Sequence, residues 1–150
     1  MPYSPGRNEE AMYHFSKVLN VSFDEAIALV TDALKAEGMG VLTEINAQAA
    51  FKKKLGIDFR RYTILGACHP QTAFQILEED DKAGVLFPCN VVVQEHQDGR
   101  VEVSAVDPLM MFLMVHSPRA KEVAQNASVM MQRVIDRLPA LQTESNLAIV

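Results

Sequence analysis

The chain has 150 residues, of which 49% are hydrophobic and 22% are charged, and its formal net charge is -5 at pH 7. A chain of this size and composition buries enough surface to fold as one globular domain, without needing disulfides or a structural metal. The acidic balance lacks the basic face that binding to phosphate backbones requires, so we expect no nucleic-acid partner.

The cysteines and the apolar runs indicate the cellular compartment in which we expect the protein. Its two cysteines are too few and too far apart for the disulfide scaffold of a small secreted protein. The first ten residues, MPYSPGRNEE, have no apolar core of a signal peptide. The longest apolar run, residues 109–115, is far shorter than the roughly 20 residues that a membrane crossing needs. We therefore expect a cytoplasmic protein with free thiols and no membrane partner.

The domain boundaries follow from composition. Residues 1–10 combine two prolines, a glycine and charges without periodicity, which predicts a flexible N-terminus. No internal repeat or low-complexity tract interrupts residues 11–139, which we interpret as a single domain. Residues 140–150 then form a C-terminal tail, whose order the sequence leaves open.

The first part of this domain alternates strands with helices. Residues 11–19 contain aromatic and β-branched side chains in imperfect alternation, which predicts a strand. The segment Ser22–Glu25 is a capping box and begins a helix that ends at Gly38. Residues 41–45 predict a second short strand.

A brief second helix follows from Asn46, which is a good N-cap, to Gly56. Its apolar residues are Ala47, Ala50, Phe51 and Leu55. The last turn holds Lys52, Lys53 and Lys54, which with Arg60 and Arg61 form the only basic cluster of the chain. These lysines complement the negative end of the helix dipole, and a solvated face explains them more simply than an anion site does.

The central part carries the cysteines. Residues 59–68 predict a third strand, and Pro70 fits the first turn of a helix, so Cys68 and His69 lie at the entrance of that helix. Residues 84–95 form an apolar run too continuous for a half-exposed strand, which predicts a central strand. The apolar residues of the helix between them are Ala73, Phe74 and Leu77.

The last part is a hairpin followed by two helices. Asp98-Gly99 turns the chain into a strand at residues 100–106. Asp107-Pro108 and Ser117-Pro118 each combine a cap with a proline and begin helices, the second of them long. In the strand we expect Val101, Val103 and Ala105 to face the core, and Arg100, Glu102 and Ser104 to face water. The buried stripe of the long helix is expected at Ala120, Val123, Ala124, Ala127, Met130, Met131, Val134, Ile135 and Leu138.

This order of elements predicts an α+β fold: a single mixed β-sheet with helices packed mainly on one face, as a two-layer sandwich. Three spaced motifs, GAC-x-P at 66–70, PCN at 88–90 and VDP at 106–108, add a family resemblance. From about Met12 to Ile135 the chain resembles the bacterial and archaeal family known as domain of unknown function 302.

The resemblance implies a small α/β sandwich-like domain, a tendency to form homodimers and no agreed activity. The family pattern falls on Glu44, Lys54, Gly66, Cys68, Pro70, Pro88, Cys89, Asn90, Asp107 and Pro108. At position 69 the family usually has asparagine, a good helix cap, whereas this chain has His69.

The candidate site consists of Cys68, His69, Cys89 and Asn90. Cys68 precedes a helix N-terminus, where the macrodipole favours a thiolate and lowers the pKa of a thiol. If the strands bring Cys89 close, the pair would exchange with a disulfide or hold a soft metal with His69 as third ligand. Pro88 indicates a bulge or a sheet edge that re-aims Asn90. The alternatives are buried, inert cysteines and an asparagine that satisfies backbone groups.

Three functions stay open at this point. The first is a small-molecule or metal-binding module that uses a pocket beside these four residues. The second is a thiol-dependent redox enzyme, in which Cys68 attacks and Cys89 resolves. The third is a non-catalytic interaction domain that acts as a homodimer. The sequence decides neither whether the protein is an enzyme nor which cofactor, ligand, metal or partner protein it binds.

Overall fold

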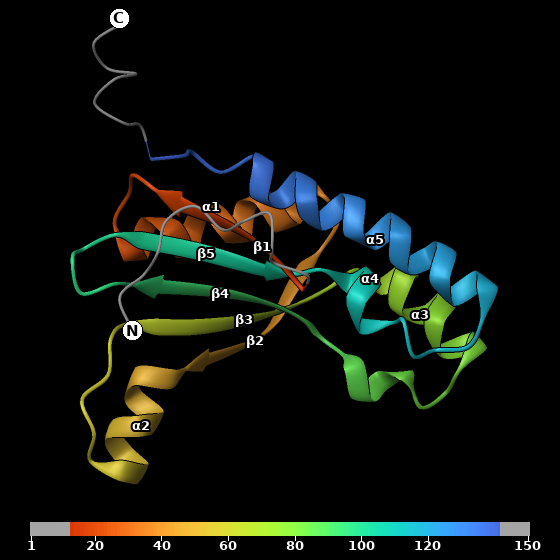
Figure 1. Ribbon diagram of the computed structural model, residues 1–150, viewed down its shortest axis with the longest axis horizontal. Coiled ribbons are helices and arrows are strands. Elements are labelled where there is room, and N and C mark those ends of the chain that lie inside the picture. Colours follow the sequence, from red (N-terminus) through yellow and green to blue (C-terminus); the bar gives the residue numbers. More distant parts are fainter. Residues whose placement is uncertain (1–12, 142–150) are drawn as a thin grey trace, which may run out of the picture.

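The computed structural model describes residues 13–141, which form a five-stranded sheet with helices around it (Figure 1). The predicted segment 1–10, and the predicted tail from residue 142 onward, lie outside the described residues. The elements are β1 (His14–Leu19), α1 (Phe23–Ala36), β2 (Gly40–Asn46), α2 (Ala47–Leu55), β3 (Tyr62–Cys68), α3 (Pro70–Glu79), the 3-10 helix η2 (Ala83–Leu86), β4 (Cys89–Glu95), β5 (Val101–Val106), α4 (Pro108–Met111) and α5 (Pro118–Asp136). The predicted α+β class is confirmed.

The sheet has the strand order β1-β5-β4-β3-β2, and all four pairings are antiparallel. The expected mixed sheet is therefore wrong. β1 and β2 do run in the same direction, but α1 carries the chain from one edge of the sheet to the other, so three strands separate them. A parallel pair would require the crossover to return to a neighbouring position.

The helix starts agree with the sequence predictions, because the first turn of each helix leaves amides that a side chain has to satisfy. Every α-helix of residues 13–141 begins at a residue whose side chain accepts from such an amide. These caps are Ser22, Asn46, His69, Asp107 and Ser117. Gly38 and Gly56 lie just beyond α1 and α2 with φ of 78° and 65°, a left-handed conformation that glycine adopts easily.

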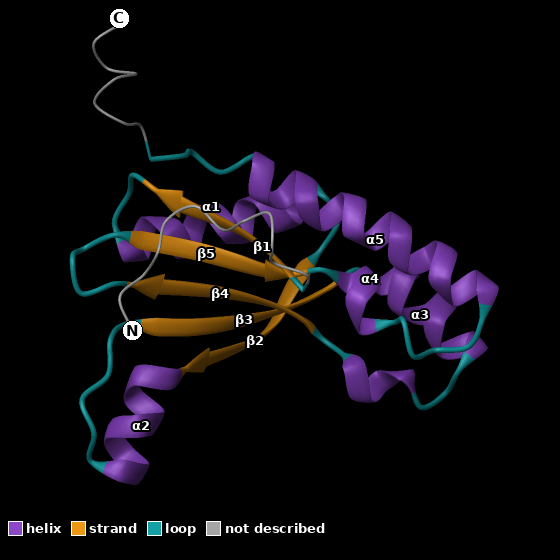
Figure 2. Cartoon of the chain, viewed as in Figure 1, coloured by secondary structure: helices purple, strands orange, loops and turns teal. Residues whose placement is uncertain are grey.

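α1 and α5 cover one face of the sheet, as expected (Figure 2). The C-terminal part of the buried stripe of α5 shares the main core with Val101, Val103 and Ala105 of β5, which confirms the inward orientation of these three residues. Glu102, expected to face water, is instead only 7% exposed, because its Oε1 lies 3.1 Å from Nε2 of His96. Ser104 is half-buried and hydrogen-bonds Ser16 at 2.7 Å.

A second, smaller core lies beyond the end of the sheet, between α3, η2, α4 and α5. α3 contributes Ile76 to it, whereas Phe74, expected on the apolar face, is exposed. The predicted strand at 84–95 is correct only from Cys89, since the preceding residues form η2. β4 is nevertheless the central strand, as predicted. None of the helices within residues 13–141 is long and apolar enough to cross a membrane.

Candidate functional site

The two cysteines lie at one end of the sheet. Cys68 is the last residue of β3 and Cys89 is the first residue of β4. The antiparallel register puts Ala67 opposite Cys89, so Cys68 is the residue next to the position opposite Cys89. Both cysteines line one cavity at this end of the sheet. Both thiols are free. The proximity on which the sequence-based hypotheses depended is therefore present.

A small cavity of about 30 Å³ lies beside these thiols. Its walls come from the ends of β3 and β4 and from α3, α4 and α5, and they are mainly apolar. The sulfur-bearing and imidazole side chains on these walls are Met39, Cys68, His69, Cys89 and Met130. A space of this size accommodates one or two water molecules, whereas sites for small organic ligands usually measure about 300–1,000 Å³. The cavity therefore fits an ion or water and is too small for a metabolite.

Asn90 does not belong to this cavity. It lies opposite Gly66 in the ladder, is exposed, and does not line the cavity. Pro88 makes no bulge, since the register irregularity of the sheet lies in β2, between Val41 and Thr43. Of the four residues of the predicted site, three therefore line the cavity, and Asn90 lies outside it.

The glycine and proline of the two cysteine motifs touch each other. A Cβ on Gly66 would lie 2.6 Å from Cγ of Pro88 and closer still to Oγ1 of Thr43. Only glycine fits this position without moving its neighbours, because real Cβ atoms do not approach so closely. The motifs GAC and PCN therefore have a packing role, which positions the two cysteines that follow.

His69 is a helix cap. Its Nδ1 accepts a hydrogen bond from the Thr72 amide at 3.3 Å and lies 2.9 Å from Thr72 Oγ1. The imidazole thus performs the capping that an asparagine would perform. Its far side faces Gly38, on which a Cβ would lie 3.3 Å from Nε2. Within residues 13–141 no three His, Cys, Asp or Glu side chains gather as a metal-ligand group, so His69 does not complete a triad with the thiols.

The two thiols are poor nucleophiles. Burial raises the pKa of Cys68 above its ordinary value. Burial, with the neighbouring charge of an ionised Cys68 as a second cause, raises the pKa of Cys89 to about 11. The pKa of Cys68 is therefore not lowered as expected, and desolvation of the buried thiol is the cause. Both thiols are protonated near neutral pH, which disfavours the redox hypothesis.

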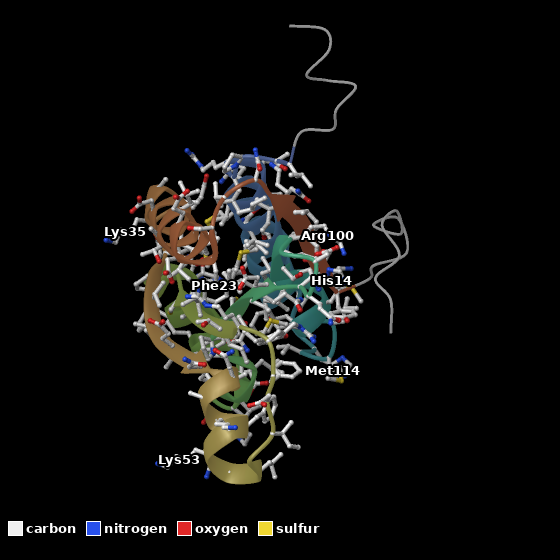
Figure 3. The ribbon with its side chains drawn as sticks, turned by 90° about the vertical axis from the view of Figure 1, so that its left-hand side faces the viewer. His14, Phe23, Lys35, Lys53, Arg100 and Met114 are labelled. Carbon is white, nitrogen blue, oxygen red and sulfur yellow. The ribbon has the colours of Figure 1, made fainter. Side chains whose placement is uncertain are left out.

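A second feature is the surface of β2 and α2. α2 buries only Ala47 of its nine residues. It extends from the edge of the sheet away from the other helices (Figure 1), and its Lys53 points outward (Figure 3). We call the exposed apolar side chains here the arm surface: Leu42, Ile45, Phe51, Leu55 and Ile57. Leu42 and Leu55 are 68% and 63% exposed. An apolar surface of this kind is typical of an interaction site.

The helix α2 packs against the loop that follows it, residues 56–61. The Phe51 and Phe59 rings pack edge to face with centroids 5.1 Å apart, and Gln48 Nε2 donates to the Phe59 carbonyl at 3.0 Å. Lys52 Nζ lies 2.9 Å from Asp58 Oδ1, but both groups are exposed, so this ion pair adds little. α2 therefore has a defined position, although its apolar side chains stay in contact with water.

A third feature lies at the opposite end of the molecule, on α3 and η2. We call its exposed apolar side chains the end surface: Phe74, Leu77 and Val85. The acidic run Glu78–Asp81 borders it. Sequence reasoning missed both surfaces, because it assigned Phe51, Leu55, Phe74 and Leu77 to apolar helix faces without a means of knowing which faces are covered.

Comparisons with known proteins give a family and no activity. The model of the domain of unknown function DUF302 matches residues 15–138. An uncharacterized protein of Aquifex aeolicus is 27% identical over 118 residues, which are 77% of this chain and 76% of that protein. The crystal structure of an uncharacterized conserved protein DUF302 from Bacillus stearothermophilus has a TM-score of 0.78 and 30% sequence identity, and the match covers 85% of this chain and 99% of that chain.

Proposed function

The chain belongs to the DUF302 family, and we propose that it is a non-catalytic interaction domain that acts as a homodimer through its arm surface. The observation that carries this proposal is α2, a nine-residue helix that buries one residue. Helices this short are marginal in water unless tertiary packing covers their apolar side. Full burial of a leucine or phenylalanine contributes about 1.5–3 kcal/mol, so covering the arm surface provides a large driving force.

The free edge of β2 supports a second copy as the occupant. β2 pairs only with β3 among the described residues, and its other edge is open. Two β2 strands related by a two-fold axis pair antiparallel, which continues the alternation already present in the sheet. An interface of this type is self-complementary, as a homodimer requires.

The same two-fold symmetry places the arm surface of one copy beside the end surface of the other. In antiparallel pairing, the end of β2 that leads into α2 lies beside the Gly40 end of the partner's β2. Gly40 pairs with Cys68, directly before α3, so α2 of one copy faces α3 of the other. The apolar side chains of the arm surface of one copy then contact those of the end surface of the other. Lys52–Lys54 on α2 meet the acidic run Glu78–Asp81 on α3, and this charge complementarity favours a second copy over an unrelated partner.

The other two hypotheses have weaker support. The thiol cavity is too small for a metabolite, and burial keeps both thiols protonated at neutral pH. Cytoplasmic location and the lack of a nucleic-acid partner stay predictions from composition.

Sedimentation equilibrium across a concentration series tests the homodimer. We expect a dimer for the natural chain and a dissociation constant raised by about tenfold or more, which is about 1.4 kcal/mol, for Leu55→Asp. Val129→Asp is the matched control, because Val129 is exposed on α5 outside both surfaces, and its dissociation constant should stay unchanged.

A charge exchange tests the contact between α2 and α3. Lys53→Glu and Glu78→Lys should each weaken the dimer, and the double variant should restore it, because the two charges attract again across the interface. A monomeric natural chain, or a dimer that Leu55→Asp leaves intact, would contradict the proposal. Single charge variants that weaken the dimer without rescue by the double variant would contradict the arm-to-end arrangement.

A further inference from the structure

Four sulfur-bearing side chains from separate segments line the small cavity. Cys68 ends β3, Cys89 begins β4, Met39 lies between α1 and β2, and Met130 belongs to α5. Met39 is almost fully buried, and the two thiols are half-buried neighbours across the ladder. Only the tertiary fold brings these side chains together, since their sequence positions show no metal-binding spacing.

The composition of the cavity walls selects the kind of ligand. No carboxylate lines the cavity, which excludes the oxygen ligands that Mg²⁺ and Ca²⁺ require. Zn²⁺ takes four N, S or O ligands in a closed structural site, and within residues 13–141 no group of three His, Cys, Asp or Glu exists. Thiolates and thioethers together are the soft donors that select Cu(I).

We propose that this cavity binds one Cu(I) ion between the thiolates of Cys68 and Cys89, with the thioethers of Met39 and Met130 as additional soft donors. On binding, each Sγ–H bond breaks, each sulfur forms a bond to copper, and two protons leave to solvent. The ion stays Cu(I), and no electron is transferred. This site is separate from the homodimer surfaces, and its occupation does not depend on them.

The protonation state of the free thiols is consistent with the replacement of two protons by one copper ion. Both thiols are free, and an ordinary thiol is protonated at neutral pH, so the ion-free protein holds two protons on these sulfur atoms. Binding must displace these protons, and the affinity for Cu(I) therefore rises with pH. The Thr72 hydrogen bonds engage Nδ1 of His69 as the cap of α3, and within residues 13–141 the imidazole forms no metal-ligand group with the two thiols.

Anaerobic competition of the full chain with bicinchoninate for Cu(I) tests the proposal, because the chelate's absorbance reports the free ion. We expect one Cu(I) per chain. Cys68→Ala and Cys89→Ala should each lower the affinity by more than about 100-fold, since loss of even an outer-shell partner costs about 10–100-fold. Met130→Leu should lower it by about tenfold. The matched control Met114→Leu, at a 75% exposed side chain outside the cavity, should leave it unchanged.

Two readouts keep the test decisive. Proton release in weakly buffered solution should approach two per ion near neutral pH, and the monomerising variant Leu55→Asp should bind Cu(I) with unchanged affinity. If an alanine variant fails to fold, the corresponding serine variant replaces it, with circular dichroism as the check. No competition with bicinchoninate by the natural chain, or equal affinity in folded cysteine variants, would overturn the proposal.

Discussion

Two of the strand–helix units within residues 13–141, β1–α1 and β2–α2, begin with an edge strand of the same sheet. Both helices have a side-chain cap at the start and a glycine with positive φ just after the end. Beyond these local features the units differ. α1 buries five side chains against the sheet and α5, whereas α2 buries one.

The strands of the two units differ in the same way. The outer edge of β1 is covered at its C-terminal end, since Ala140 bridges Leu19 and the Leu141 amide donates to the Val18 carbonyl at 2.8 Å. The outer edge of β2 has no such cover among residues 13–141. Capping and stop signals thus specify where a helix forms, and they carry no information on what will cover it. Within residues 13–141, the β2–α2 unit therefore carries the exposed apolar side chains and the open strand edge that we propose a second copy covers.

Replacing one leucine by alanine in α1 and one in α2 should give the largest difference in the free energy of unfolding between the two units. Leu34→Ala in α1 should lower the free energy of unfolding by about 2–5 kcal/mol, because Leu34 is fully buried and leaves a cavity. Leu55→Ala in α2 should change it by less than about 0.5 kcal/mol when measured below the concentration at which dimers form. Urea unfolding followed by circular dichroism measures both. Equal losses would show that α2 is packed as firmly as α1 in the single chain.

Glycine substitutions test a position where β2 packs tightly on its neighbours. Gly66→Ala should destabilise the protein by about 1–3 kcal/mol, because the added Cβ collides with Thr43 and Pro88. Gly40→Ala is the matched control, since a Cβ there meets nothing within 4 Å. Thermal unfolding compares the two variants. A harmless Gly66→Ala would mean that β2 moves away from β3 at little cost.

The smallest expected effect concerns the ion pairs of the two helices. Glu37 follows α1, and although desolvation opposes its ionisation, the guanidinium groups of Arg137 and Arg133 hold the pKa of its carboxyl below its ordinary value of 4.5. Because the folded pKa is the lower one, this stabilisation is present above pH 4.5 and is lost as pH falls through the folded value.

Glu37→Gln should therefore cost about 1 kcal/mol near neutral pH and much less in acid. Lys52→Gln, which removes the exposed ion pair of α2, should have an effect below about 0.5 kcal/mol at either pH. Denaturant midpoints at the two pH values measure the difference. An effect of Glu37→Gln that is the same in acid as at neutral pH would contradict the ion-pair explanation.

Local rules predicted the helices of this protein well, and long-range contacts account for the errors. Ser22, Asn46 and Ser117 begin helices where expected, because a cap acts within one turn. Glu102 is buried because His96, across a tight turn, pairs with it. The expected mixed sheet failed because the path of α1 across the whole sheet has no signature in any short segment.

The candidate site shows the same division between what local sequence signals predict and what long-range contacts decide. The sequence identified Cys68 and Cys89 as a pair worth examining, and the register of β3 and β4 makes them neighbours. It placed Asn90 with them, although Asn90 is exposed and lies outside the cavity. It had no means of adding Met39 and Met130, which reach the cavity from distant segments.

By itself, the sequence determined the α+β class, the helix caps and stops, the inward row of β5 and the stripe of α5, because each depends on residues a few positions apart. The tertiary structure alone decided the strand order, the volume of the thiol cavity, the raised pKa of its two thiols and the exposure of α2. These properties depend on desolvation and on contacts between segments far apart in the chain, which no local pattern encodes.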